Sequence, residues 1–185
     1  MPYPQARLTS IEGLVEVIST PFLDARGSFL NAFRQEDWQP WWGERPLQQI
    51  NISRTEQIGA LRGLHTQLGP SPEAKLVRCL RGRVWDVAVD VRISSPTWGQ
   101  WHAVELSPQA ANALLIPEGC LHGFQVLEPG SELLYVHSAP YRPDDQLGVL
   151  WSDPQLAIPW PLPPTDLSPR DQQLPLLSHL PDLRP

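Results

Sequence analysis

Residues 84–91 read Val84-Trp85-Asp86-Val87-Ala88-Val89-Asp90-Val91, and this run lies between Gly82 and the turn Ser94-Ser95-Pro96. A stretch rich in β-branched residues and bounded by turn-forming residues is typical of a strand. Similar runs occupy residues 101–106, 113–116, 124–127 and 133–137, separated by Gly, Pro, Asn or Ser. Short strands at this spacing favour an all-β sandwich or barrel over alternating β and α units.

Helical patterns are weak and occur only over residues 35–42 and 108–111. The chain contains 22 prolines, and many of them follow Asp153, which predicts an extended tail over about residues 152–185 that wraps the domain. The tail carries apolar residues that we expect to serve as buried anchors. These are Trp151, Ile158, Trp160, Leu162, Leu176 and Leu177.

The overall composition describes an ordinary globular protein. A length of 185 residues predicts one domain over residues 1–185, and 41% hydrophobic with 18% charged residues is enough to form a core. The net charge of −6 argues against broad nucleic-acid binding, although it permits a local group of basic residues for one diphosphate. The sequence shows neither a signal peptide nor a run of about 18 apolar residues, so we expect a cytoplasmic protein with no membrane partner.

Cys79 and Cys120 are the two cysteines, and both lie in apolar, strand-like runs. We expect two buried thiols in a reducing compartment. The chain has no Cys-x-x-Cys pair that would favour a zinc site.

Five ionisable residues on strand-like or turn segments offer the groups that proton transfer beside a carbonyl requires. They are His65, Lys75, His122, Tyr135 and Asp171. Histidine titrates closest to neutral pH, so His65 is the candidate base. A carboxylate on the far imidazole nitrogen would fix the tautomer, and we assign this role to Asp171. Lys75 offers positive charge for a developing enolate, and Tyr135 offers a proton for the opposite face.

Each of these residues also has a simpler interpretation. A lone histidine in a strand is more often a hydrogen-bonded structural residue, and a tyrosine in an apolar run is more often part of the core. Lys75 could cover a solvated face, and Asp171 could cap a turn or a helix. The residues point to an enzyme only when they are taken together with the motifs around them.

The run Pro117-x-Gly119-x-x-His122 resembles the second motif of the cupins, which are jelly-roll proteins. The first cupin motif supplies His-x-His and a following Glu to a metal, whereas this chain has His65-Thr66-Gln67. Two imidazoles without a nearby carboxylate make a poor metal site, so we expect no metal.

From about residue 20 to residue 177, the chain resembles the dTDP-4-dehydrorhamnose 3,5-epimerase family of sugar-nucleotide epimerases. Motifs in a consistent order carry the resemblance, and any one of them alone would be weak. They are residues 22–29 (FLDARGSF), 61–65 (LRGLH), 75–78 (KLVR), 84–92 (VWDVAVDVR), 95–99 (SPTWG), 116–124 (IPEGCLHGF), 134–135 (LY), Trp151-x-Asp153-Pro154, 158–161 (IPWP) and Leu167-Ser168-x-x-Asp171.

The resemblance implies an all-β, cupin-type jelly-roll sandwich over about residues 45–140 with a few short helices and a Pro-rich tail. It implies a homodimer that exchanges N-terminal strands, uses no cofactor, and epimerises C3 and C5 of a dTDP-4-keto-6-deoxy sugar through an enolate. His65 with Asp171 then accepts the proton, Tyr135 donates it, and Lys75 contacts the sugar. The substrate-binding residues implied are Phe22, Arg26, Phe29, Asn31, Gln49, Asn51, Arg62, His122, Tyr141, Gln146 and Arg170, with Arg26 and Arg62 at the diphosphate and Tyr141 stacked on the base.

Five positions depart from the usual family residue. Asn31 and Gln146 replace Glu, Ile50 replaces Asp, Thr66 replaces an aromatic residue and Arg170 replaces Lys. The proton-transfer residues are kept, whereas the changes fall on positions that read the substrate. We therefore expect unchanged chemistry with a possible change in nucleotide, sugar or inverted carbon.

Three alternatives stay open at this point. The first is a monofunctional 3- or 5-epimerase, or an isomerase, that acts on a different nucleotide 4-keto sugar. The second is a cupin that binds a sugar nucleotide without catalysis. The third is a metal-dependent oxygenase, which the missing His-x-His argues against.

Overall fold

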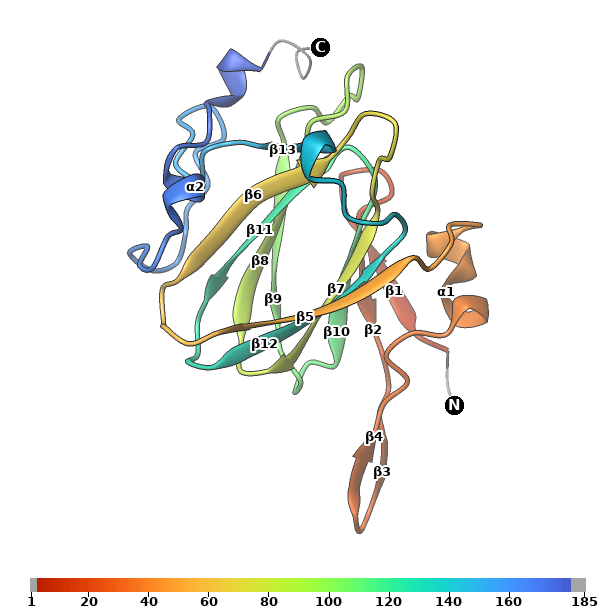
Figure 1. Cartoon of the computed structure of the whole chain (residues 1–185). Helices are drawn as coiled ribbons and strands as arrows, with labels where there is room; N and C mark the ends of the chain where they lie inside the picture. The colour runs from red at the N-terminus through yellow and green to blue at the C-terminus, as the bar shows by residue number, and fades with distance from the viewer. Residues whose placement is uncertain (1–2, 181–185) are drawn as a thin grey trace.

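Two antiparallel sheets face each other in the computed structural model, which describes residues 3–180 (Figure 1). The six-stranded sheet runs in the order β1 (Gln5–Leu8), β2 (Val15–Ile18), β10 (Asn112–Ile116), β7 (Lys75–Arg81), β12 (Ser131–His137) and β5 (Gln49–Thr55). The five-stranded sheet runs in the order β13 (Gln146–Gly148), β6 (Leu61–Gln67), β11 (Cys120–Val126), β8 (Val84–Asp90) and β9 (Trp101–Leu106). The predicted all-β jelly-roll sandwich is confirmed.

The strands predicted from the apolar runs are all present. β8 and β9 match their predicted ranges to within one residue, whereas β11 begins four residues before the predicted start and so includes His122. Strands β1, β2 and β13 lie outside residues 45–140 but also pair into the two sheets.

Only one of the two expected helical segments forms a helix. α1 spans Gln35–Trp42, as predicted. The prediction over residues 108–111 was wrong, because the short connection between β9 and β10 closes as one turn in which Ala111 N–H donates to the Pro108 carbonyl over 3.2 Å. Ala111 has a φ of 49°, which ends the turn there. A short helix in the tail, α2 (Pro169–Gln172), and the 3-10 helices Pro143–Asp145 and Leu177–His179 complete the described helical segments.

Three groups of buried side chains hold the layers together. The group between the sheets includes Val77 and Leu114 from one sheet and Ala88 and Phe124 from the other. On the outer face of the six-stranded sheet, α1 buries Trp38 and Trp42 against strand residues. On the outer face of the five-stranded sheet, the tail covers β8. Because both faces of these strands are covered, their sequences are apolar almost throughout.

Up to Leu180 the tail packs along the five-stranded sheet, as its apolar anchors predicted, whereas residues 181–185 of the predicted tail lie outside the described residues. Ile158 and Leu177 are buried, and the indole ring of Trp160 packs edge-on to Trp85 at 5.4 Å between ring centroids. Trp160 Nε1–H also donates to the Trp151 carbonyl. The tail is therefore a structured wall of the molecule.

Cys79 and Cys120 are buried free thiols, as predicted. Within residues 3–180, no helix is long and apolar enough to cross a membrane.

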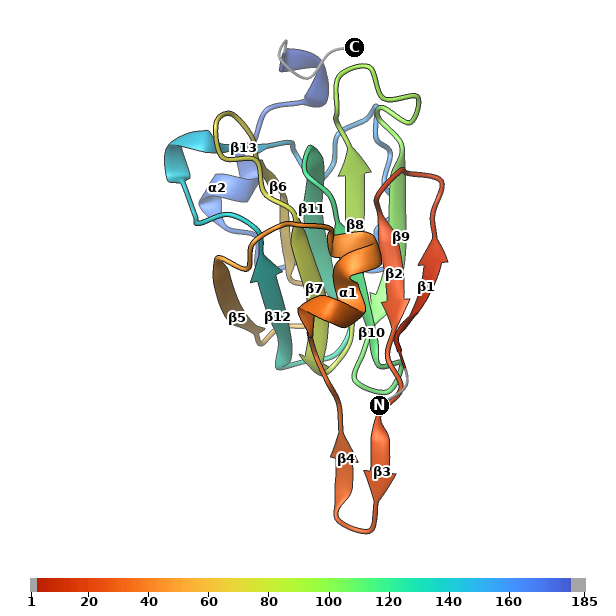
Figure 2. The ribbon, with the colours of Figure 1, turned by 90° about the vertical axis from the view of Figure 1, so that its right-hand side faces the viewer.

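A hairpin of β3 (Phe22–Asp24) and β4 (Gly27–Phe29) projects away from the body of the sandwich (Figures 1 and 2). Its two strands pair with each other and with no other described strand. Phe22, Leu23 and Phe29 are 60–71% exposed. Such exposure of neighbouring large apolar side chains is typical of an interaction surface.

Candidate active site

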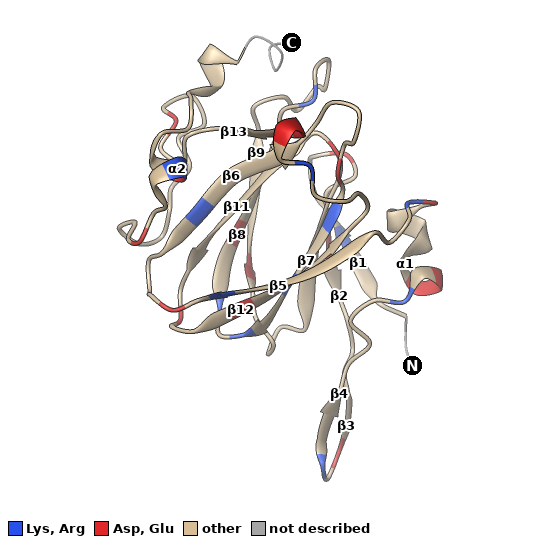
Figure 3. Cartoon of the chain, viewed as in Figure 1, with Lys and Arg blue, Asp and Glu red and all other residues tan. Residues whose placement is uncertain are grey.

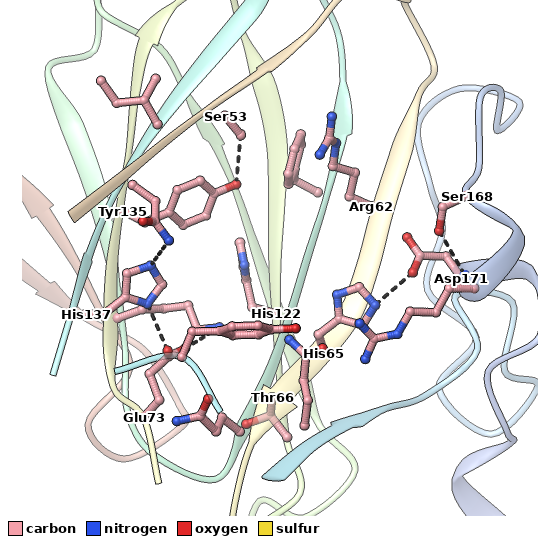
Figure 4. A pocket seen from close by; sticks show the side chains of 18 of the residues that line it. Ser53, Arg62, His65, Thr66, Glu73, His122, Tyr135, His137, Ser168 and Asp171 are labelled. Carbon is pink, nitrogen blue, oxygen red and sulfur yellow. Dashed lines mark hydrogen bonds and ion pairs between the residues drawn. The ribbon is translucent and has the colours of Figure 1, made fainter. Parts of the chain in front are cut away.

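A cavity of about 880 Å³ opens between the two sheets (Figure 4). Side chains from β5, β7 and β12 line one wall, and side chains from β6, β11 and β13 line the other. The tail contributes residues around α2 to the rim. All four residues predicted to carry the chemistry line this one cavity: His65, Lys75, Tyr135 and Asp171.

His65 on β6 forms a hydrogen bond with Asp171, and the distance from Nε2 to Oδ1 is 2.8 Å. Because a carboxylate can only accept, His65 donates its Nε2–H, and in the neutral form of the ring the lone pair lies on Nδ1. Burial would raise the pKa of Asp171, but the hydrogen bond and charge of His65 outweigh it and hold this pKa below its ordinary value. Asp171 is therefore an ionised partner for the imidazole.

Asp171 reaches His65 because the tail delivers it on α2. Ser168 caps this short helix, and its Oγ accepts the Asp171 N–H over 3.0 Å. Oδ2 of Asp171, the carboxylate oxygen that does not contact His65, accepts the Gly63 N–H over 3.3 Å. Gly63 has a φ of 119°, and a Cβ there would lie 2.6 Å from the Gly123 Cα, so both positions require glycine for β6 and β11 to approach this closely.

Tyr135 comes from β12 in the opposite sheet, and its phenol faces the cavity from the other side (Figure 4). Its hydroxyl lies 3.3 Å from the Ser53 hydroxyl on β5. Burial raises the pKa of Tyr135 above its usual value, so the phenol keeps its proton at neutral pH.

Lys75 lines the cavity beside Glu73, whose Oε1 lies 2.9 Å from Lys75 Nζ. Glu73 Oε2 lies 2.9 Å from His137 Nδ1. This second contact is a close approach of two ionisable groups rather than an in-line hydrogen bond, since Nδ1 has no hydrogen-bond partner. Burial would raise the pKa of Glu73, but the contacts with His137 and Lys75 outweigh it and lower this pKa to about 2.

His122 on β11 stands directly opposite His65 in the strand register. Its Nε2 lies 2.8 Å from Oδ1 of Asp86, a fully buried carboxylate on β8. Its ring also packs edge-on to Tyr135, with centroids 6.1 Å apart. His122 therefore connects the His65 wall to the Tyr135 wall.

Most of the predicted substrate-binding residues also surround the cavity. Those that line it are Asn51, Arg62, His122, Tyr141, Gln146 and Arg170. Gln49 stands behind them and donates to Asn51 Oδ1 over 3.0 Å, while its own Oε1 accepts the Tyr141 N–H. Arg62 and Arg170 are the basic residues of β6 and α2, which appear as blue segments in Figure 3.

The other four predicted substrate-binding residues do not reach the cavity of their own chain. Phe22, Arg26 and Phe29 lie on the projecting hairpin, where Arg26 pairs with Asp24. Asn31 donates to Asp37 over 3.5 Å beside α1. Among residues 3–180, no group of three His, Cys, Asp or Glu side chains is placed to hold a metal ion.

Residues 8–179 match the family model described as dTDP-4-dehydrorhamnose 3,5-epimerase. The chain belongs to this family. It is 43% identical over 161 residues to a dTDP-4-dehydrorhamnose 3,5-epimerase of Sinorhizobium fredii, covering 86% of this chain and 83% of that protein. It is 39% identical over 178 residues to a dTDP-4-dehydrorhamnose 3-epimerase of Streptomyces niveus, covering 95% and 85%.

A solved structure supports the same assignment. The dTDP-6-deoxy-D-glucose-3,5-epimerase of Legionella pneumophila, in complex with dTDP-4-keto-L-rhamnose, superimposes with a TM-score of 0.92 at 37% identity, covering 98% of this chain and 97% of that one. The predicted family, isomerase class and jelly-roll fold are confirmed.

Sequence reasoning missed four side chains that contact the predicted site of this epimerase family member. They are Ser53, Glu73, Asp86 and His137. The strand sequences contained a signal for two of them, since residues two apart on a strand share a face and a carboxylate inside an apolar run is unusual. His137 follows Tyr135 by two residues on β12, and Asp86 is a carboxylate inside the apolar run of β8.

Proposed function

We propose that this protein epimerises C3 and C5 of a 4-keto-6-deoxy nucleotide sugar, converting dTDP-4-dehydro-6-deoxyglucose to dTDP-4-dehydrorhamnose. One observation carries the proposal: His65, paired with Asp171 of the tail, and the Tyr135 phenol come from opposite sheets and line one cavity. Inversion of a carbon requires a proton acceptor on one face of the sugar and a proton donor on the other. The names of the relatives support dTDP as the nucleotide.

His65 accepts the proton in the first step. Its Nε2–H is engaged by Asp171, so Nδ1 takes the proton from the carbon next to the C4 ketone. The C–H bond breaks, its electron pair forms the C=C bond of an enolate, and the ketone oxygen takes up negative charge. Asp171 stabilises the imidazolium that results, and Lys75 supplies positive charge for the enolate oxygen.

Tyr135 completes the inversion in the second step. The phenol gives its proton to the carbon from the opposite face, and the enolate returns to a ketone. One proton leaves and one proton enters at each carbon, so the sequence needs no oxidant or reductant. Proton exchange with water returns the imidazolium of His65 and the phenolate of Tyr135 to their starting states before the second carbon reacts. The raised pKa of Tyr135 supports its role as a neutral donor at the start of the step.

The polar residues at the rim suit the nucleotide diphosphate. Arg62 and Arg170 line the cavity, and an Arg guanidinium matches the oxygens of a phosphate. Tyr141 is 51% exposed beside Gln49 and Asn51, so its ring is available to stack on the base.

We further propose a homodimer in which the β3–β4 hairpin reaches the partner subunit. β1 and β2 pair within the chain, so the exchange concerns the hairpin, whose apolar side chains are uncovered. Ile50 and Ile52 on the edge strand β5 are 55% and 65% exposed and offer an apolar surface of the same kind. In the dimer Phe22, Arg26 and Phe29 of one subunit would then face the cavity of the other.

The two cysteines bear on the location of the protein in the cell. Both are buried free thiols, which suit a reducing compartment and support a cytoplasmic location.

A monofunctional 3-epimerase is the second candidate. The Streptomyces niveus relative carries that name and matches over nearly the whole chain. Thr66 and Gln146 on the cavity wall differ from the usual family residues and lie beside the sugar in this proposal. These positions could restrict inversion to one carbon.

Incubation with dTDP-4-keto-6-deoxyglucose, followed by chemical reduction and analysis of the sugars, tests the proposal. The double epimerase yields sugars of the rhamnose configuration. A product inverted only at C3 supports the second candidate. If neither carbon is inverted, a panel of 4-keto sugars on other nucleotides separates a change of substrate from a lack of catalysis.

A further inference from the structure

Glu73 and His137 form a carboxylate–imidazole pair that the steps above do not use. The pair lines the cavity on the Tyr135 side, whereas His65 and Asp171 lie across from it (Figure 4). Glu73, His137 and Lys75 are only 6–9% exposed. Ionisable groups buried to this extent are stable only when they are paired, so the three side chains act as one fixed unit.

His137 is the member of this unit that touches Tyr135. The two rings stack with centroids 5.9 Å apart and an interplanar angle of 17°. On its other edges, His137 Nδ1 lies 2.9 Å from Glu73, and Nε2 lies 3.3 Å from the Asn51 amide nitrogen. Contacts on both ring nitrogens restrain the imidazole, which in turn supports one face of the phenol.

Glu73 is the member that holds Lys75. A lysine ammonium on a four-carbon stem is mobile unless a partner restrains it. Here the carboxylate lies 2.9 Å from Nζ, on residues only two apart in the chain. Glu73 therefore determines where the positive charge of Lys75 lies in the cavity.

We propose, on the basis of the function proposed above, that His137 and Glu73 are positioning residues for separate steps of the epimerisation. His137 holds the Tyr135 ring for the proton return, and Glu73 holds the Lys75 ammonium for enolate formation. The enolate forms first, and only then does a proton return to the carbon from one face or the other. A defect at Lys75 therefore slows exchange and inversion equally, whereas a defect at Tyr135 slows inversion while exchange continues from the His65 face.

The test at His137 compares His137→Ala with His137→Phe in D₂O. Deuterium uptake at the sugar carbons and completed inversion are followed together by NMR. Loss of the ring should lower the ratio of inversion to exchange by about 10-fold to 100-fold, the range that a misplacement of about 1 Å costs. His137→Phe keeps a ring to stack on Tyr135 and should restore the ratio. His102→Ala, at a half-buried histidine outside the cavity, is the matched control and should leave the ratio unchanged.

The test at Glu73 compares Glu73→Ala with Glu73→Gln. Alanine releases Lys75 and should slow exchange and inversion together by about 10-fold or more. Glutamine keeps an oxygen for the Lys75 ammonium and should recover most of the rate. The ratio of inversion to exchange should stay at its wild-type value in Glu73→Gln. In Glu73→Ala it should fall less than in His137→Ala, because the stacked His137 ring and its contact with Asn51 remain.

Two results would overturn the proposal: an unchanged ratio in His137→Ala, or equal rates in Glu73→Ala and the wild type. The ring-flip rate of isotope-labelled Tyr135 gives a readout that does not depend on turnover, and assignment is simple because the chain has three tyrosines. His137→Ala should accelerate the flips and His137→Phe should not. If the wild-type protein exchanges neither proton, the proposed function fails, while the ring-flip rates still decide whether His137 positions Tyr135.

Discussion

At His65, the direction of one hydrogen bond determines which nitrogen can act as the base. Asp171 accepts from Nε2, so Nδ1 remains for the substrate. At Tyr135, burial raises the pKa of the phenol and keeps its proton in place until an enolate forms. The two side chains thus stand in different surroundings, His65 beside a carboxylate and Tyr135 buried with its hydroxyl near Ser53.

Tyr135→Phe separates the two proton transfers. The ring and its stacking on His137 remain, whereas the proton of the opposite face is lost. We expect deuterium exchange to continue and completed inversion to fall by about 10²–10⁴-fold, the contribution typical of general acid catalysis. NMR in D₂O measures both quantities. Inversion at the wild-type rate would show that Tyr135 is not the donor.

The lowered pKa of Glu73 predicts that the stability difference between the wild-type protein and Glu73→Gln depends on pH. A carboxyl whose pKa falls from 4.5 to about 2 on folding stabilises the protein above its unfolded pKa. This stabilisation is lost as the pH falls from about 4.5 towards about 2. Glu73→Gln should therefore lower the free energy of unfolding at pH 7 by about 1–3 kcal/mol. Urea titrations should show this difference in the free energy of unfolding shrinking as the pH falls from about 4.5 to about 2. A constant difference would contradict the lowered pKa of Glu73.

Residues that a short motif accompanies could be selected as candidates from the sequence. His65 stands in an Arg-Gly-Leu-His run and Asp171 in Leu-Ser-x-x-Asp, so both could be recognised. Glu73 stands in none of these motifs, and Asp86 was not singled out within the run of residues 84–92. The contacts of both come from partners that the fold brings close. Asp86 is 36 residues from His122 in the sequence, and only the pairing of β8 with β11 places them together.

At the scale of elements, the proline-rich tail supplies Asp171 to the hydrogen-bonded pair with His65. Asp153 anchors it, since one carboxylate oxygen accepts the Gln155 and Leu156 N–H groups and the other accepts the Leu177 N–H over 2.7 Å. Gln125 adds a second anchor through both atoms of its amide to the backbone of Leu162. The tail therefore presents Asp171 to His65 from a fixed path.

Asp153→Ala should weaken this anchoring. Three backbone N–H groups lose their acceptor, and each one left buried without a partner costs about 1–3 kcal/mol. We expect a lower melting temperature and a fall in the rate of inversion, because Asp171 is held less firmly. Ser152→Ala, at the exposed neighbouring position, is the control. An unchanged rate in a destabilised Asp153→Ala variant would show that the anchor does not affect Asp171.

The strands could be predicted because β-branched runs between turn residues specify them locally. The turn over residues 108–111 could not be distinguished from a helix, because four residues with helical propensity look alike in both. The path of the tail was also beyond prediction. Its apolar anchors indicated that it is buried. The face of the sandwich that they cover depends on how the tail fits the outer surface of each sheet, which the sequence does not specify locally.

At the scale of the whole molecule, the proposed dimer would complete each site with the projecting hairpin of a second chain. Its exposed Phe22 and Phe29 have no covering element among residues 3–180, and the cavity is open at its rim. A second copy of the chain would cover the two phenylalanine side chains and close the rim of the cavity. The dimer and the completed cavity are therefore expected to depend on the same residues.

A double substitution, Phe22→Ser with Phe29→Ser, should shift the protein from dimer to monomer. Each substitution removes apolar area that the dimer would bury, and such burial stabilises an interface by about 25 cal/mol per Å². Light scattering coupled to gel filtration measures the mass, and Leu8→Ser, at an exposed residue on the opposite edge strand β1, is the control. A wild-type protein that is monomeric at all concentrations would rule out the dimer.

Solvent exchange at the sugar carbons tests the central claim, proton transfer at C3 and C5 across this cavity, most directly. The protein is incubated with dTDP-4-keto-6-deoxyglucose in D₂O, and the C3 and C5 proton signals are followed by NMR. We expect both signals to disappear with the wild-type protein, and both to persist with His65→Ala, in which exchange falls by about 10²–10⁴-fold. Retention of both signals by the wild-type protein, or undiminished exchange by His65→Ala, would contradict the account.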